Sequence, residues 1–270
     1  MFDAAIIGGG PAGISAALTF RQRGKQAVIL TAGGDSSHLA KAERVDNYPG
    51  MPAMSGGEMM EIMTRQAETA GVAFQQGHVT GILPMGEGFG LAMGQEFVEA
   101  RCIVLCTGVN LGKPYSGETE FLGRGVSYCA TCDGMMYRNK DVAVIGLSHD
   151  AEEEAEFLRK IGCRVEYFDT KRAKQYEVVG EQTVTGLKAD GTEYPVQGVF
   201  ILREGISPDL LLQGLKTENG QISVDRKMQT NLPGVFAAGD CTGAPYQIAK
   251  SVGEGNVAAL SAVKYLDTKE

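Results

Sequence analysis

The segment from residue 4 to residue 30 constrains the fold more than any other part of the chain. An apolar run at residues 4–7 predicts a buried strand, a glycine-rich turn then opens a helix, and residues 27–30 predict a second strand. In such a unit Gly8 makes the tight turn, Gly10 lets the backbone approach a pyrophosphate, and Gly13 lets helix and strand pack closely. This order of elements predicts an α/β fold that binds a dinucleotide at the start of the helix.

The acidic residue that ends the second strand of such a unit and holds a ribose is missing. Residues 28–34 contain no carboxylate, and the first one that follows is Asp35. We expect the backbone of Gly33 and Gly34 to hold the ribose instead, because glycine lets a ligand approach the chain closely.

A second copy of the unit begins at Asp141 and follows the first at a constant offset in the sequence. Its glycine positions are altered: Leu147 and Ser148 put side chains where a pyrophosphate needs bare backbone, and three glutamates at 152–154 add negative charge to the helix start. Such carboxylates also stabilise a helix that binds nothing. After residue 168 there is no room for another parallel crossover, and hairpin-like segments follow. We expect a shortened, degenerate nucleotide-binding fold.

The last third of the chain returns to the first fold. A strand of small residues at 234–238 leads to Gly239 and Asp240, and a further helix begins near residue 247. A carboxylate at a strand end beside a helix N-terminus suits a ribityl or ribose hydroxyl. Its alternative role is to cap a helix or a turn.

The segment Tyr128-Cys129-Ala130-Thr131-Cys132-Asp133-Gly134 carries the chemistry. Two thiols at this spacing can close into a disulfide whose reduction moves two electrons and two protons, and Asp133 is a candidate proton donor or acceptor. The same spacing is half of a zinc site, but the other cysteines are single and the histidines show no ligand spacing. We therefore expect a redox pair and no metal.

Composition narrows the class of protein. A chain of 270 residues with 43% apolar residues can fill two ordinary cores. No apolar run approaches the roughly 18 residues that span a bilayer, and the first residues do not form a signal peptide, so we expect a soluble cytoplasmic protein. The net charge of -8 argues against nucleic acid or an anionic membrane as partner.

Several blocks, in the same order along nearly the whole chain, resemble the low-molecular-weight thioredoxin reductases. They are Gly8 to Gly13, Asn47-Tyr48-Pro49-Gly50, Thr107-Gly108, the segment from Gly125 to Gly134, and Gly234 to Asp240. The resemblance implies an α/β fold of two Rossmann-like domains in three ββα layers, the second truncated and inserted in the first. It implies a discontinuous FAD domain (1–109 and 223–270), an inserted redox domain (110–222) and a homodimer.

The resemblance also implies roles for individual residues. Cys132 would face the flavin, Cys129 would exchange with thioredoxin, and Asp133 would be the acid or base. Together, the motifs and the resemblance predict these cofactor-binding residues: Gly8, Gly10, Pro11, Ala12, Gly13, Gly33, Gly34, Asn47, Val79, Thr107, Gly108, Gly239, Asp240, Gln247 and Ile248.

The second fold departs from the family's NADPH site. The glycine-rich turn is altered, and only Lys171 and Arg172 stand where the family has a His-Arg-Arg segment. The chain therefore looks most like the ferredoxin-dependent flavin thioredoxin reductases, which lack a working NADPH site. Three alternative hypotheses are an NADPH-dependent thioredoxin reductase, an oxidase of small dithiols that uses oxygen, and a flavin redox sensor without turnover.

Overall fold

The computed structural model describes the chain except for residues 33–38, 95, 109–113, 129, 149–150, 204–207 and 270, and except for the side chains of Cys132 and Asp209. The chain divides into two compact units. The first unit comprises Met1–Asn110 and Ser207–Glu270, and the second comprises Leu111–Ile206.

The sheet of the first unit is parallel at its centre, with an antiparallel hairpin at one side. Its parallel strands, in spatial order, are β3 (Ala73–Gln76), β2 (Ala27–Thr31), β1 (Phe2–Ile7), β6 (Glu96–Leu105) and β16 (Val235–Ala237). The strands β4 (Gly81–Met85) and β5 (Gly88–Met93) form the hairpin, which pairs with the first half of β6. The second half of β6 thus lies between β1 and β16.

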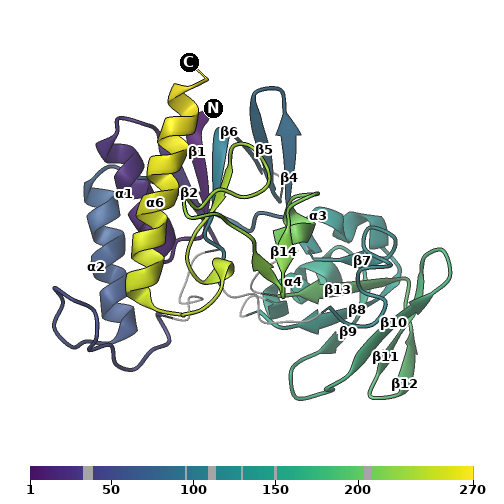
Figure 1. Ribbon diagram of the computed structural model, residues 1–270. Coiled ribbons are helices and arrows are strands. Elements are labelled where there is room, and N and C mark those ends of the chain that lie inside the picture. The colour runs from purple at the N-terminus through teal and green to yellow at the C-terminus, as the bar shows by residue number, and fades with distance from the viewer. Residues whose placement is uncertain are drawn as a thin grey trace. The chain divides into compact units, whose positions relative to one another are not determined.

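Three helices of the first unit lie side by side, with α1 (Pro11–Gln22) next to both α2 (Gly56–Thr69) and α6 (Ile248–Asp267), as Figure 1 shows. Alternate residues of β1, β2 and β6 pack against them in one hydrophobic core. The backbones of α1 and α6 come very close, because a Cβ on Gly255 would stand 2.1 Å from the carbonyl oxygen of Ala12. The hydroxyl of Ser15 on α1 also donates to the carbonyl of Val252 on α6, at 2.7 Å.

The second unit repeats the Rossmann-like arrangement on a smaller scale. Its parallel strands, in spatial order, are β7 (Val126–Ser127), β13 (Gly198–Leu202), β8 (Asp141–Gly146) and β9 (Arg164–Phe168). One face of this sheet packs on α4 (Ala151–Lys160), and the other packs on an antiparallel sheet. That sheet consists of β10 (Tyr176–Gly180), β11 (Val184–Ala189) and β12 (Thr192–Pro195). The predicted α/β class with two Rossmann-like folds is confirmed.

Along the chain, the first unit is interrupted after residue 110 and resumes at residue 207. Residues after 206 group with the first unit because α5 (Pro208–Leu211) contacts β4, and β15 (Gln221–Ile222), which pairs with β14 (Thr217–Glu218), contacts η2 (Asp240–Thr242). Whether the units carry the two predicted chemistries stays a prediction.

No helix in the described part of the chain combines the length and the apolar character needed to cross a bilayer.

The close approach of α1 and α6 predicts opposite effects for two alanine substitutions in α6. Gly255→Ala should lower the free energy of unfolding by about 1–3 kcal/mol, because the new Cβ meets the backbone of Ala12. Gly253→Ala, whose Cβ would meet nothing within 4 Å, should raise it by about 0.5–1 kcal/mol. Chemical denaturation followed by circular dichroism measures both. Equal effects would contradict the contact between the two helices.

Candidate cofactor and redox sites

Three parallel strands of the first unit end at the same level and form one edge of the sheet. In the register, Leu105 of β6 lies between Ile7 of β1 and Ala237 of β16. The chain leaves β1 toward β2 on one side, while β6 lies on the other, so this is the topological switch point at which α/β folds bind ligands. The structure therefore brings the predicted residues that follow these strands to one edge: Gly8, Gly10, Thr107, Gly108, Gly239 and Asp240.

The turn between β1 and α1 leaves bare backbone at this edge. Gly8 has a φ of 115°, and a Cβ there would stand 2.1 Å from the carbonyl oxygen of Cys106. Gly13 lies against the same turn, where its Cβ would stand 1.9 Å from the carbonyl oxygen of Gly8. Gly10 is the N-cap of α1, makes no side-chain cap, and has open space where a Cβ would be. The positive end of α1 thus carries bare backbone, which suits a pyrophosphate.

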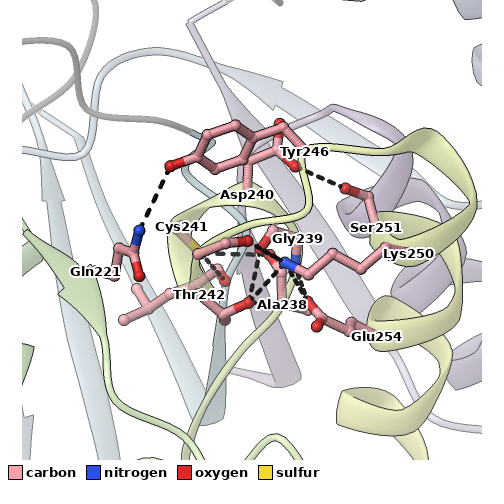
Figure 2. Close-up of polar contacts among 12 residues, drawn as sticks. Gln221, Ala238, Gly239, Asp240, Cys241, Thr242, Tyr246, Lys250, Ser251 and Glu254 are labelled. Carbon is pink, nitrogen blue, oxygen red and sulfur yellow. Dashed lines mark hydrogen bonds and ion pairs between the residues drawn. The ribbon is translucent and has the colours of Figure 1, made fainter. Parts of the chain in front are cut away.

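The turn after β16 is bonded by two residues of α6, Lys250 and Glu254, as Figure 2 shows. The Lys250 ammonium donates to the carbonyl oxygens of Gly239 and Gly243, at 2.9 and 2.6 Å, and to the hydroxyl of Thr242, at 3.0 Å. The Glu254 carboxylate accepts from the Gly239 N–H and the Thr242 hydroxyl, both at 2.9 Å. The sequence analysis missed this pair, although its i, i+4 spacing on a helix was a usable signal.

The carboxylate that this turn presents is Asp240. Gly239 adopts a φ of 88°, and a Cβ on it would stand 2.9 Å from the Cβ of Ala12, so the turn lies directly against the start of α1. The hydroxyl of Ser251 donates to Asp240 Oδ1 at 3.2 Å (Figure 2). The carboxylate therefore stays at the sheet edge, close to the glycine turn, where it can accept a bond from a sugar hydroxyl.

The remaining predicted cofactor residues divide into three groups. Asn47 Nδ2 donates to Gln247 Oε1 at 3.3 Å, so the structure joins two predicted residues that are far apart in the sequence, beside Ile248 at the start of α6. Val79, in the segment that links β3 to β4, is buried, and its cofactor role stays a prediction. Gly33 and Gly34 lie outside the described residues.

In the second unit, residues 130–132 of the Cys-x-x-Cys segment lie in a short helix, α3 (Ala130–Asp133). This helix is followed by η1 (Gly134–Tyr137). Cys129 and the Cys132 side chain lie outside what the structure describes. Asp133 Oδ2 accepts from the buried hydroxyl of Ser127 at 2.7 Å. The N–H of Ala130 donates to Glu154 Oε2 at 2.9 Å. The sequence analysis assigned no role to Ser127 or Glu154 in the redox site.

At the edge where the parallel strands of the second unit end, described side chains of the unit bond one another or pack on its core. Tyr128 follows β7 and Arg203 follows β13, and Glu118 joins the two: its carboxylate pairs with both ends of the Arg203 guanidinium and accepts from the Tyr128 hydroxyl at 3.0 Å. The Glu118 side chain is only 2% exposed. Leu147, which follows β8, packs against the hydrophobic core.

Of the two basic residues at 171 and 172, Arg172 has partners within its own unit. Arg172 forms an ion pair with Glu166, donates to the carbonyl oxygen of Tyr167 at 2.5 Å, and lies over the Phe168 ring with its guanidinium carbon 4.4 Å from the centroid. Its guanidinium is thus engaged by the same strand, β9, that precedes it.

Comparison with known proteins decides the family. The model of the family "Pyridine nucleotide-disulphide oxidoreductase" matches residues 2–174 and 169–255. The chain belongs to the pyridine nucleotide-disulphide oxidoreductases.

Within this family the chain is similar to thioredoxin reductases of the low-molecular-weight type. It is 34% identical to the thioredoxin reductase of Aquifex aeolicus over 307 residues, which cover 100% of this chain and 95% of that protein. It is 32% identical to that of Listeria innocua over 302 residues, covering 99% and 94%. The predicted resemblance is confirmed.

Solved structures agree with this assignment. The crystal structure of a ferredoxin-flavin thioredoxin reductase from Clostridium acetobutylicum matches with a TM-score of 0.93 at 37% identity, covering 99% of this chain and 98% of that one. A thioredoxin reductase from Gloeobacter violaceus matches with a TM-score of 0.84 at 31% identity, covering 100% and 95%.

Pyridine nucleotide-disulphide oxidoreductases and thioredoxin reductases are FAD-binding flavoproteins, which agrees with the predicted cofactor. The first unit of this family member fits such a group. The open backbone at Gly10 suits the pyrophosphate, and the carboxylate of Asp240 suits a hydroxyl of the ribityl or ribose. Within the described part of the chain, no three His, Cys, Asp or Glu side chains come together as a metal site.

The four described cysteines of this oxidoreductase are buried. Burial raises the pKa of the Cys106 thiol and raises that of Cys241 to about 11. Burial also raises the pKa of Cys102 and Cys163. The Cys241 thiol donates to the carbonyl oxygens of Ala238 and Leu105, at 3.3 and 3.4 Å. The interpretation of Cys102 and Cys106 as small core residues is confirmed, and Cys241 packs in the same way.

Loss of the Lys250–Glu254 pair should loosen the Asp240 turn. Lys250→Met is expected to lower the free energy of unfolding by about 1–3 kcal/mol, because it removes the donor of the Gly243 carbonyl and the cationic partner of the Glu254 carboxylate. In Lys250→Met/Glu254→Gln the loss should be smaller than the sum of the single losses. Lys264→Met, exposed on the same helix, is the control and should change the value by less than about 0.5 kcal/mol. Strictly additive losses in urea denaturation would contradict the pairing.

Burial also predicts which thiols react. In the reduced native protein at pH 9, iodoacetamide should leave Cys102, Cys106 and Cys241 unmodified, because their raised pKa values keep them protonated and the core excludes the reagent. Cys129 and Cys132 should react. Peptide mass spectrometry before and after unfolding measures this. Rapid native labelling of Cys106 or Cys241 would contradict their place in the core.

Proposed function

We propose that this protein is a flavoprotein disulfide reductase in which electrons pass through FAD to the Cys129–Cys132 disulfide and on to thioredoxin, with reduced ferredoxin as the donor. FAD would lie at the sheet edge of the first unit, held at the start of α1 and by Asp240. A homodimeric, cytoplasmic enzyme is part of the same proposal and rests on the family resemblance.

The observation that carries the proposal is the contrast between the two sheet edges. The edge of the first unit offers bare backbone at Gly10 and a hydrogen-bonded carboxylate. The corresponding edge of the second unit offers Leu147 and a buried ion pair between Glu118 and Arg203. A dinucleotide fits the first edge, whereas at the second it would have to displace an ion pair whose separation costs several kcal/mol.

The contacts of Arg172 also support ferredoxin as the donor. A nucleotide carrying a 2′-phosphate is commonly bound by an arginine near the end of the second strand. Here that arginine pairs with Glu166 and stacks on Phe168. Binding NADPH would require it to leave both partners, whereas ferredoxin requires only a docking surface and a short electron path. The ferredoxin-flavin thioredoxin reductase of Clostridium acetobutylicum, to which the chain is similar, adds to this support.

FAD supplies a carrier that takes up electrons singly or in pairs and releases them to a disulfide. The chain's own residues would handle protons and the partner. Asp133, held by the Ser127 hydroxyl, is proposed to deliver or remove a proton at the second cysteine. Cys129 would attack the disulfide of thioredoxin. Met135 and Met136, directly after the motif and 58% and 62% exposed, give this region an apolar surface suited to a protein partner.

The donor is tested by anaerobic spectroscopy of the purified flavoprotein. Excess NADPH should leave the visible absorbance of the flavin unchanged, and reduced ferredoxin should bleach it, because the second sheet edge is filled. Bleaching by NADPH within seconds would show that the donor is wrong. In Cys132→Ser, ferredoxin should still bleach the flavin while reduction of thioredoxin is lost. If wild type and this variant both fail to reduce thioredoxin, the acceptor is wrong.

A further inference from the structure

One end of the parallel sheet in the second unit carries a group of basic side chains, although the net charge of the chain is -8. Three segments meet there: the turn before β8, the last turn of α4 and the start of β9. We call their five exposed cations the basic patch: Arg138, Lys140, Arg159, Lys160 and Arg164. The sequence separates these residues into three groups, which the fold brings to one end of the sheet.

Hydrogen bonds hold the three segments together. The N–H of Asn139 donates to the carbonyl oxygen of Gly162 at 3.1 Å, and the N–H of Arg164 donates to that of Lys140 at 2.9 Å. The Arg164 guanidinium also donates to the carbonyl oxygen of Asn139 at 2.9 Å. Gly162 has a φ of 100°, and a Cβ there would stand 3.2 Å from Asn139 Oδ1. The backbone that carries the cations is therefore fixed relative to the sheet.

Only part of the charge of the basic patch is neutralised within the protein. Arg164 pairs with Asp141 through two nitrogens, at 2.6 and 2.7 Å, and Arg159 lies 3.3 Å from Glu156. In the part of the chain that the structure describes, three cations of the patch have no carboxylate within 4 Å: Arg138, Lys140 and Lys160. The patch thus keeps a positive charge that attracts an acidic surface over roughly 10 Å at 0.1 M salt.

Two exposed methionines adjoin the basic patch. Met135 and Met136 belong to η1, and Arg138 follows η1 directly. The start of η1 packs against the end of α4, because a Cβ on Gly134 would stand 2.8 Å from the Leu158 side chain. An exposed apolar pair beside unpaired cations suits a protein partner, since apolar contacts supply affinity and the charges steer the approach.

We propose that the basic patch, together with Met135 and Met136, is the docking surface for an acidic protein, namely the thioredoxin that accepts the electrons. This inference rests on the proposed function, which makes a protein disulfide the acceptor. The surface lies in the unit that carries the redox motif, and η1 directly follows α3. The electron donor must instead reach the flavin, which the proposed function assigns to the first unit.

The basic patch has a simpler alternative role. Cations in the last turn of a helix stabilise that helix, and Arg159 and Lys160 end α4. This role does not extend to Arg138 and Lys140, which precede a strand. A variant of Lys140 therefore separates docking from stabilisation of the helix.

The test is the binding of a fluorescently labelled acidic thioredoxin to the full-length flavoprotein, measured by anisotropy at about 20 mM and about 300 mM NaCl. Lys140→Glu and Lys160→Glu should each raise the Kd about threefold at low salt, and the double variant about tenfold, because each reverses a charge that faces an acidic surface. High salt should weaken wild-type binding and reduce these differences to less than about twofold.

Lys174→Glu is the matched control. It reverses one exposed charge in the loop after β9, at the other end of that strand, and should change the Kd by less than about twofold. Absence of binding to the wild type at low salt would overturn the inference, and so would equal effects of Lys174→Glu and Lys140→Glu. Far-UV circular dichroism and flavin content show whether each variant is folded.

Two activities separate this inference from the proposed function. The double variant should raise the KM for thioredoxin and leave the bleaching of the flavin by reduced ferredoxin unchanged. Slower bleaching with an unchanged Kd for thioredoxin would assign the basic patch to the donor and overturn the inference. If thioredoxin binds as expected but is not reduced, the proposed function falls and the docking surface stands. If thioredoxin is reduced and its Kd is the same in every variant, only the docking surface falls.

Discussion

The close approach of bare backbone at the start of α1 is the constraint on which the rest of the first unit depends. The carbonyl of Gly8 stands where a side chain on Gly13 would be, and the carbonyl of Ala12 stands where one on Gly255 would be. Strand β1, helix α1 and helix α6 can therefore meet only if these positions carry no Cβ. Because they meet, the turn that carries Asp240 comes to lie beside the N-terminus of α1, and this is the arrangement proposed to hold FAD.

In the second unit the corresponding turn carries side chains in place of glycines. Leu147 packs against the core, and the carboxylate of Glu118 bonds both Tyr128 and Arg203, which follow two different strands. The parallel sheet and its helix survive, because they depend on buried apolar residues rather than on the turn. One of the three glutamates that follow the altered turn, Glu154, accepts the N–H of Ala130 at the start of α3.

In each unit an ion pair that is at least partly buried holds a loop. Lys250 and Glu254 hold the Asp240 turn, and Glu118 and Arg203 hold the residue before Cys129. In each case the charges also form hydrogen bonds with backbone or hydroxyl groups, so the pair fixes a loop rather than adding much net stability. Ion pairs of this kind make the position of a reactive or binding residue reproducible.

The sequence by itself determined the fold class, the repeated unit, the glycine turn and the spacing of the Cys-x-x-Cys motif, because these depend on local periodicity and on residues without a Cβ. It also placed Asp240 and Gln247 at element ends. Only the tertiary structure decided that Asn47 meets Gln247, that Lys250 lies under Gly239, and that Glu154 reaches Ala130. Such contacts join residues whose separation in sequence carries no periodic signal, and they form only when packing brings helices and strand ends together.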